Sequence, residues 1–163
     1  MKIYILIILF CTLTAAGFVK AGGLHRKVYE IDGLINLIAL IKDKISYFKT
    51  PLNILLLEAC EISGKYRAVS AFGGILQKDS NIVSAWQSVD CENILGEEAC
   101  RIADEFFSSL GGSGVEGQTQ LCDSTMHRLE YCRQKALEEV ENKAKLYKSL
   151  GFLAGAFAVI MFV

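Results

Sequence analysis

The chain has 163 residues, which is the length of one domain, or of one small domain with appended segments. Apolar residues make up 52% and charged residues 21%, so the chain has either a large apolar core or membrane segments. The net charge of −1, from 17 basic and 18 acidic residues, argues against nucleic-acid binding, and two histidines leave little material for a metal site.

An uncharged apolar run covers residues 3–19, and its 17 residues are at the short limit of a membrane-spanning helix. Three basic residues follow the run: Lys20, Arg26 and Lys27. Such a basic flank stays on the cytoplasmic side, so we expect an N-terminal membrane anchor over residues 1–22. A cleaved signal peptide is the alternative, because small residues such as Ala15 and Ala21 fit a cleavage site.

The chain from residue 23 to residue 146 is expected to be a helical cytoplasmic domain. Its first predicted helix, over residues 28–49, carries an apolar stripe at three- and four-residue spacing. The stripe consists of Ile31, Leu34, Ile35, Ile38, Ile41, Ile45 and Phe48. Thr50 and Pro51 have the residue types of an N-cap and a first helical position, so a second helix should run to about Ile62.

Three shorter helices are expected next, over residues 66–77, from Asp79 or Ser80 to Trp86, and over residues 93–109. A loop over residues 111–114 follows, because it consists of three glycines and a serine, and glycine tolerates a positive φ. Ser113 and Glu116 have the spacing of a capping box, which predicts the start of another helix.

The last predicted helix is the longest, because no helix breaker falls between Gly117 and Gly151. Its apolar stripe consists of Leu121, Thr125, Leu129, Cys132, Ala136, Val140, Ala144 and Tyr147. The uncharged residues 150–163 extend it, and they predict a short C-terminal membrane anchor over residues 147–163. A buried core helix, or the discarded tail of a lipid-anchor signal, is the alternative. The predicted fold class is all-α, an antiparallel bundle of about six helices with N- and C-terminal membrane anchor helices.

Five cysteines lie in the predicted cytoplasmic domain: Cys60, Cys91, Cys100, Cys122 and Cys132. Because cytoplasmic thiols stay reduced, we predict free, largely buried thiols here rather than disulfides. None of the five has zinc-knuckle spacing, so no metal site is predicted. In a secreted chain, the even total of six cysteines would instead indicate a disulfide framework.

The sequence predicts no catalytic residue, no cofactor and no small-molecule substrate. Neighbouring acids point about 100° apart on a helix, and His127 and Cys132 do not share a helical face closely. No nucleophile, base and orienting group can therefore be assembled. The 111–114 loop lacks the lysine of a phosphate-binding loop, so we interpret it as a turn between helices.

Four short segments follow one another in a recognisable order. They are LINLIALIKDKISYFKTPL at residues 34–52, SAW at residues 84–86, Leu-Gly-x-Ser with a later glutamine at residues 110–118, and YKSLGFLAG at residues 147–155. Together they resemble the stage III sporulation protein AB family over nearly the whole chain. Gly114 departs from the pattern, since the family commonly has an aspartate there.

The resemblance implies a non-enzymatic, membrane-anchored scaffold of the assembly that links mother cell and forespore during endospore development. It implies that the protein lies in the mother-cell membrane that faces the forespore, with its central domain in the cytoplasm. It implies, as partners, the cytosolic secretion-type ATPase protein AA and other membrane proteins of the assembly. The implied helical fold is similar to that of the platform proteins of type II secretion and type IV pili. The alternative is a secreted, disulfide-stabilised helical binding protein with a cleaved signal peptide.

Acidic residues are concentrated in the middle of the chain. From Asp79 to Asp123 the sequence contains nine acidic residues and one basic residue, Arg101, so this stretch has a charge of −8. We predict an acidic docking face for a basic patch on the ATPase, and the candidate residues are Glu97, Glu98, Asp104 and Glu105. A solvated surface that only keeps the domain soluble is the alternative.

Overall fold

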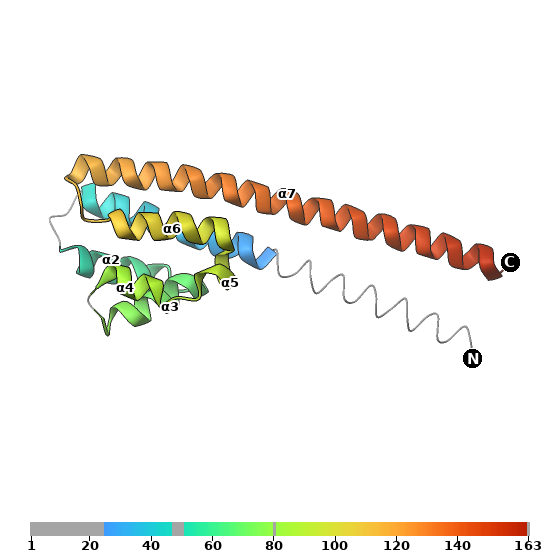
Figure 1. The fold of residues 1–163 in the computed structure, drawn as a ribbon, viewed down its shortest axis with the longest axis horizontal. Coiled ribbons are helices and arrows are strands. Elements are labelled where there is room, and N and C mark those ends of the chain that lie inside the picture. Colours follow the sequence, from blue (N-terminus) through green and yellow to red (C-terminus); the bar gives the residue numbers. More distant parts are fainter. Residues whose placement is uncertain (1–24, 47–50, 80, 163) are drawn as a thin grey trace. The chain divides into compact units, whose positions relative to one another are not determined.

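The computed structural model describes residues 25–46, 51–79 and 81–162, and it shows helices and connecting turns but no strand in these ranges (Figure 1). The predicted all-α class and the helical bundle are therefore confirmed. One helix covers residues 25–46. The others are α2 (Leu52–Ile62), α3 (Arg67–Leu76), α4 (Ile82–Gln87), α5 (Cys91–Leu95), α6 (Glu97–Ser109) and α7 (Val115–Phe162).

The chain divides into two compact units. One unit consists of residues 27–134, and the other joins residues 1–26 with residues 135–163. The first unit contains the buried aromatic side chains and the four acids that the sequence suggests as a docking face. The three segments predicted from the sequence, with boundaries after residues 22 and 146, stay a prediction.

The 25–46 helix supplies one side of the core, because its apolar stripe is buried as predicted. Leu34, Ile38 and Ile41 are fully buried, and so is Leu37, which the predicted stripe did not include. Phe48 and Thr50 lie outside the described residues. Two ion pairs connect this helix to α7: Lys42 Nζ lies 2.6 Å from Asp123 Oδ1, and Arg133 Nε lies 2.5 Å from Asp32 Oδ1. These pairs fix the register between elements that are far apart in sequence.

Aromatic side chains from α3, α4 and α6 form the centre of the core. The Trp86 indole stacks on Phe107 with ring centroids 4.4 Å apart, and Phe72 meets both rings at 5.6 and 4.8 Å. All three side chains are almost completely buried. Each such ring buries a large apolar area, so this cluster contributes strongly to the stability of the unit.

The N-terminus of α3 is capped from a distance. Its N-cap residue, Tyr66, makes no side-chain capping hydrogen bond. Instead, Glu30 on the 25–46 helix accepts a hydrogen bond at Oε2 from the Ala68 N–H, at 3.2 Å. The Glu30 side chain is only 2% exposed, so a buried carboxyl group takes the place that a local serine or aspartate usually fills.

The predicted fifth helix is wrong in one respect, because the structure divides it in two. Gly96 has a φ of +91°, which is the left-handed region, and it separates α5 from α6. A Cβ at this position would strain the backbone, so glycine is required. A single glycine between leucine and glutamate is no clear stop signal in a sequence, since isolated glycines are tolerated inside helices.

Two predicted helix starts also differ from the structure. Pro51 is the N-cap of α2, and Leu52 is its first helical residue. Asn81, rather than Asp79, caps α4, because its Oδ1 accepts hydrogen bonds from the N–H groups of Val83 and Ser84 at 3.0 and 3.2 Å. Asp79 has a supporting role, since its Oδ1 accepts from the Asn81 N–H at 3.0 Å.

The 111–114 loop is confirmed, but the predicted capping box is not. Gly111 has a φ of +87°, and α7 begins at Val115. Gln118, which is 5% exposed, holds the loop: its Oε1 accepts from the Gly111 N–H at 3.1 Å, and its Nε2 donates to Ser113 Oγ at 3.2 Å. The Gln118 N–H donates to the Gly114 carbonyl at 2.9 Å, so Gly114 precedes the helix and Ser113 lies one residue too early for the predicted capping box.

The predicted long final helix is confirmed as α7, which runs without a break from Val115 to Phe162. Within the residues that the structure describes, no helix combines the length and the apolar character needed to cross a membrane. The predicted C-terminal anchor over residues 147–163 is thus not supported. The predicted N-terminal anchor over residues 1–22 lies outside the described residues.

Candidate docking surface on α6

Helix α6 separates its residues sharply into a buried and an exposed face. Ala99, Ile102, Ala103, Phe106 and Phe107 are buried together with Cys100. At about 100° per residue, the exposed side chains fall within an arc of about 140°. They are Glu97, Glu98, Arg101, Asp104, Glu105, Ser108 and Ser109. The four predicted docking residues, Glu97, Glu98, Asp104 and Glu105, thus share one strip, which is called the acidic strip below.

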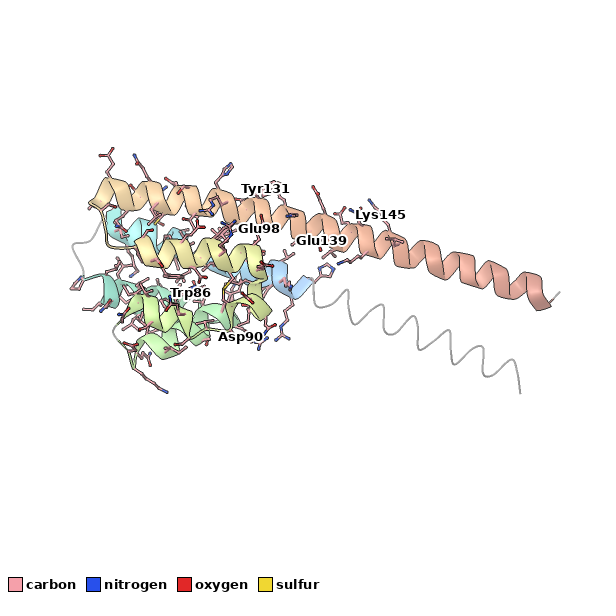
Figure 2. The ribbon with its side chains drawn as sticks, viewed as in Figure 1. Trp86, Asp90, Glu98, Tyr131, Glu139 and Lys145 are labelled. Atoms are coloured by element: carbon pink, nitrogen blue, oxygen red, sulfur yellow. A yellow bond between two sulfur atoms is a disulfide. The ribbon has the colours of Figure 1, made fainter. Side chains whose placement is uncertain are left out.

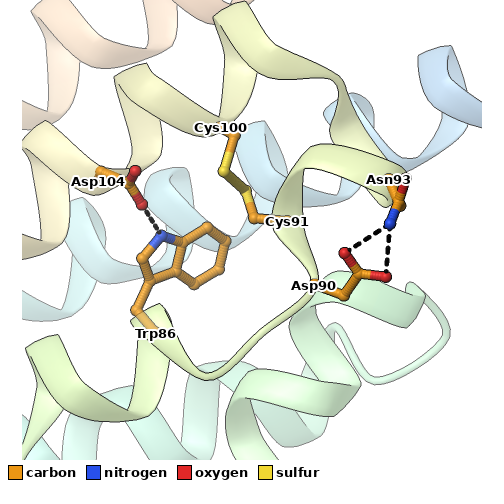
Figure 3. Close-up of a disulfide and its surroundings, with 6 residues drawn as sticks. All are labelled: Trp86, Asp90, Cys91, Asn93, Cys100 and Asp104. Atoms are coloured by element: carbon orange, nitrogen blue, oxygen red, sulfur yellow. Dashed lines mark hydrogen bonds between the residues drawn. A yellow bond between two sulfur atoms is a disulfide. The ribbon is translucent and has the colours of Figure 1, made fainter.

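Asp104 has a structural partner. Its Oδ1 accepts a hydrogen bond from the indole N–H of Trp86 at 2.7 Å, as Figure 3 shows. Trp86 is buried, and a buried indole N–H without a partner would cost about 1–3 kcal/mol. The Asp104 carboxylate therefore stabilises the aromatic core, besides facing solvent.

Glu105 is held by two arginines. Its Oε1 lies 3.0 Å from Arg101 Nη1, one turn earlier on α6, and its Oε2 lies 2.7 Å from Arg128 Nη1 on α7. The hydrogen bond from Arg128 is the main reason why the pKa of Glu105 is lowered. The charge at this end of the acidic strip is thus largely neutralised within the protein.

The other end of the acidic strip is at the first turn of α6. Glu97 and Glu98 occupy the first two helical positions and are exposed. Carboxylates here interact favourably with the unsatisfied N–H groups of the helix start. Figure 2 labels Glu98 among the side chains of this unit. Both glutamate side chains are exposed to solvent at the start of the helix.

A disulfide spans the connection between α5 and α6. It joins Cys91, the first residue of α5, to Cys100 on α6 (Figure 3). The two Cα atoms are 5.5 Å apart, which is usual for such a bond. The prediction that all five cysteines of the domain are free thiols is therefore wrong for this pair. No cue in the sequence indicates the pairing, because it depends on the turn at Gly96 that brings α5 back against α6.

Cys60 and Cys122 are free, buried thiols, as predicted, and the Cys132 side chain is buried as well. Burial raises the pKa of Cys60 to about 12, and burial is also the main cause that raises the pKa of Cys122 to about 11. Both groups are protonated at neutral pH, so neither is an activated nucleophile. No group of three or more histidine, cysteine, aspartate or glutamate side chains with metal-binding geometry occurs among the described residues.

The fold and this surface define an all-helical protein with an acidic strip beside a cross-linked turn. A family model described as stage III sporulation protein AB matches residues 2–163, and the chain belongs to that family. The resemblance seen in the sequence is thus confirmed, and membership implies a role in sporulation. No curated protein and no solved structure matches the chain.

Proposed function

We propose that this protein is a non-enzymatic scaffold that docks the cytosolic secretion-type ATPase, protein AA, of the sporulation assembly. The observation that carries the proposal is the exposed first turn of α6, where Glu97 and Glu98 face solvent next to a helix whose opposite face is fully buried. A rigid helix can present acids at fixed positions to a basic partner, and complementary charges speed association.

Neighbouring acids extend this surface on α5. Asp90 precedes the first residue of α5 and Glu92 lies in its first turn, and both are exposed. Asp90 accepts hydrogen bonds from Asn93 Nδ2 at 2.9 and 3.0 Å, so its orientation is fixed. Asp104 is bound to the buried Trp86 indole, and Glu105 is paired with two arginines. We therefore narrow the proposed docking surface to the α5–α6 junction, with Glu92 and Glu97 at its centre.

Membrane attachment remains part of the proposal. Its support is the uncharged run over residues 3–19, followed by basic residues that include Lys20 and Lys27. This order of charges would keep the helical unit in the cytoplasm, at the mother-cell membrane that faces the forespore. A cytosolic ATPase would then reach the α5–α6 junction directly.

The test is a binding measurement between the full-length chain in detergent and the purified ATPase. Glu92→Lys combined with Glu97→Lys should weaken binding at least tenfold, which is about 1.4 kcal/mol or more. The affinity of the unaltered chain should also fall as salt rises, because exposed charges are screened over about 8 Å at physiological ionic strength. Binding that survives both changes would overturn the proposed surface.

The matched control applies the same charge change elsewhere. Glu138 and Glu141 on α7 are exposed, so Glu138→Lys with Glu141→Lys alters the net charge equally. This control should bind the ATPase as the unaltered chain does, and circular dichroism should show equal helix content in all three proteins. Equal weakening by both variants would indicate a general charge effect instead of a docking site.

One observation favours the alternative of a secreted, disulfide-stabilised binding protein. The Cys91–Cys100 bond is of the kind that persists in oxidising compartments. The two functions differ in the fate of residues 3–19, which would be removed from a secreted chain and retained in an anchored one. Intact mass of the protein purified from its own cells therefore decides between them.

A further inference from the structure

We propose that Cys91 and Cys100 form a reversible redox cross-link, which pins α5 to α6 when oxidised and releases α5 when reduced, while the rest of the helical unit stays folded. This inference does not depend on the proposed docking of an ATPase. It follows from the place of the bond in the fold and from the few other interactions that hold α5.

Besides this bond, α5 is held mainly by Leu95, which is buried, and by Ile94, which packs partly buried against the core. The helix contains five residues, and its N-cap residue, Asp90, makes no side-chain capping hydrogen bond. Its buried residues are Cys91 and Leu95, so half of its buried side chains belong to the cross-link itself. Helices this short are not stable alone, because the cost of the first turn is not recovered. The disulfide is therefore a major restraint on α5.

The rest of the unit has independent support. The Trp86, Phe72 and Phe107 rings come from α4, α3 and α6, and they pack directly against one another. Ion pairs such as that of Lys42 with Asp123 connect the 25–46 helix to α7. Opening of α5 would leave these contacts in place, so local release does not require global unfolding.

The chemistry of release is thiol–disulfide exchange with a dithiol reductant. A reductant thiolate attacks one Sγ, the Sγ–Sγ bond breaks, and the departing cysteine sulfur takes up a proton. The second reductant thiol then attacks the mixed disulfide, which frees the other cysteine and leaves the reductant as a disulfide. Two electrons and two protons pass to the protein, so Cys91 and Cys100 become thiols.

Access to the bond controls the rate of this exchange. Cys91 and Cys100 are 5% and 7% exposed, so a reductant reaches them when α5 moves away from α6. Cys60 and Cys122 do not interfere, because both are buried, with pKa values raised to about 12 and about 11. Protonated thiols attack disulfides poorly, and the cross-link therefore does not shuffle to these positions.

Hydrogen exchange measured by mass spectrometry tests the proposal on the full-length chain in detergent. Reduction with dithiothreitol should speed amide exchange in peptides covering residues 91–96 at least about tenfold, while peptides of α2 change by less than about twofold. The emission maximum of Trp86, the single tryptophan, should not move, because the aromatic core stays dry. Equilibration in glutathione buffers, followed by alkylation, should show two thiols appearing and disappearing reversibly.

Two variants complete the test. Cys91→Ser with Cys100→Ser should reproduce the fast exchange of the reduced chain and lose its response to dithiothreitol. Cys60→Ala removes a thiol outside the cross-link. Amide exchange of α5 in this variant should therefore still become faster when dithiothreitol is added. The proposal is overturned if α5 exchanges equally in both redox states, if all helices accelerate together on reduction, or if the two cysteines never pair in glutathione buffers.

Discussion

At each end of α6 a glycine with a positive φ leads to the neighbouring helix, but the two junctions are held together differently. At the α5–α6 junction, Gly96 is followed within four residues by a covalent bond from Cys100 back to Cys91. At the α6–α7 junction, Gly111 donates a hydrogen bond to the buried side chain of Gln118. One junction thus depends on the redox state of the surroundings, and the other does not.

This difference shows that a sharp helix connection needs two components. The glycine permits the backbone conformation, and a second interaction across the turn selects it over a continued helix. At Gly111 the second component is the hydrogen bond to Gln118, a residue close in sequence. At Gly96 it is covalent, so this junction loses its second component when the bond is reduced. Four sets of variants can break or sharpen this comparison.

Removing the disulfide should have the largest effect. Cys91→Ser with Cys100→Ser should lower the free energy of unfolding by about 2–3 kcal/mol relative to the oxidised chain, because a closed loop of about ten residues no longer limits the unfolded state. Urea titration followed by Trp86 fluorescence measures this change. The reduced, unaltered chain should have the same free energy of unfolding as the variant. A variant as stable as the oxidised chain would show that the disulfide does not stabilise this junction.

Removing the polar component of the other junction comes next. Gln118→Ala should cost about 1–3 kcal/mol in either redox state, because the Gly111 N–H and the Ser113 hydroxyl lose a buried partner. Gln120 is exposed on the same helix, so Gln120→Ala is the matched control and should stay within about 0.5 kcal/mol. Similar losses for both variants would show that Gln118 does not hold the loop.

Changing the glycines themselves should cost less. Gly96→Ala and Gly111→Ala should each destabilise the domain by about 1–2 kcal/mol, since a side chain disfavours the left-handed region. Gly74 lies within α3 with no atom near its absent Cβ, so Gly74→Ala should stabilise by about 0.5–1 kcal/mol. The melting temperature should fall for Gly96→Ala and Gly111→Ala and rise for Gly74→Ala. A stabilising Gly96→Ala would mean that the positive φ is not required there.

The smallest effect is expected at the end of the second junction. Gly114 precedes α7, its carbonyl accepts from the Gln118 N–H at 2.9 Å, and a Cβ added to it would meet no atom within 4 Å. Gly114→Asp, which restores the residue common in the family, should raise stability by a few tenths of a kcal/mol through capping. Gly112→Asp is a control outside the cap position. A clear loss of melting temperature in Gly114→Asp would contradict this placement.

The sequence predicted the helices well where a long apolar stripe or a cluster of turn residues was present. The stripe from Ile31 to Ile45 and the three glycines between residues 111 and 114 are signals of this kind, and both were confirmed. The break at Gly96 was missed, because the φ of a lone glycine depends on tertiary contacts that the sequence does not display. The same holds for the Cys91–Cys100 bond, which forms only after that turn.

The candidate surface was predicted in part. Helical periodicity correctly places Glu97, Glu98, Asp104 and Glu105 on one exposed face of α6. It does not reveal that Asp104 accepts from Trp86, or that Glu105 pairs with Arg128, because those partners lie 18 and 23 residues away in sequence. With these contacts, the Asp104 and Glu105 end of the acidic strip also stabilises the fold.

The long-range cap on α3 has a consequence for the order in which the protein can fold on the ribosome. Glu30 precedes Ala68 by 38 residues, so the capping carboxyl group is synthesised well before the helix that it caps. A nascent chain that ends after α3 already contains both partners, whereas the ion pair of Lys42 with Asp123 must wait for α7. Since chains emerge from the N-terminus, α3 can dock on the 25–46 helix while α6 and α7 are still being translated.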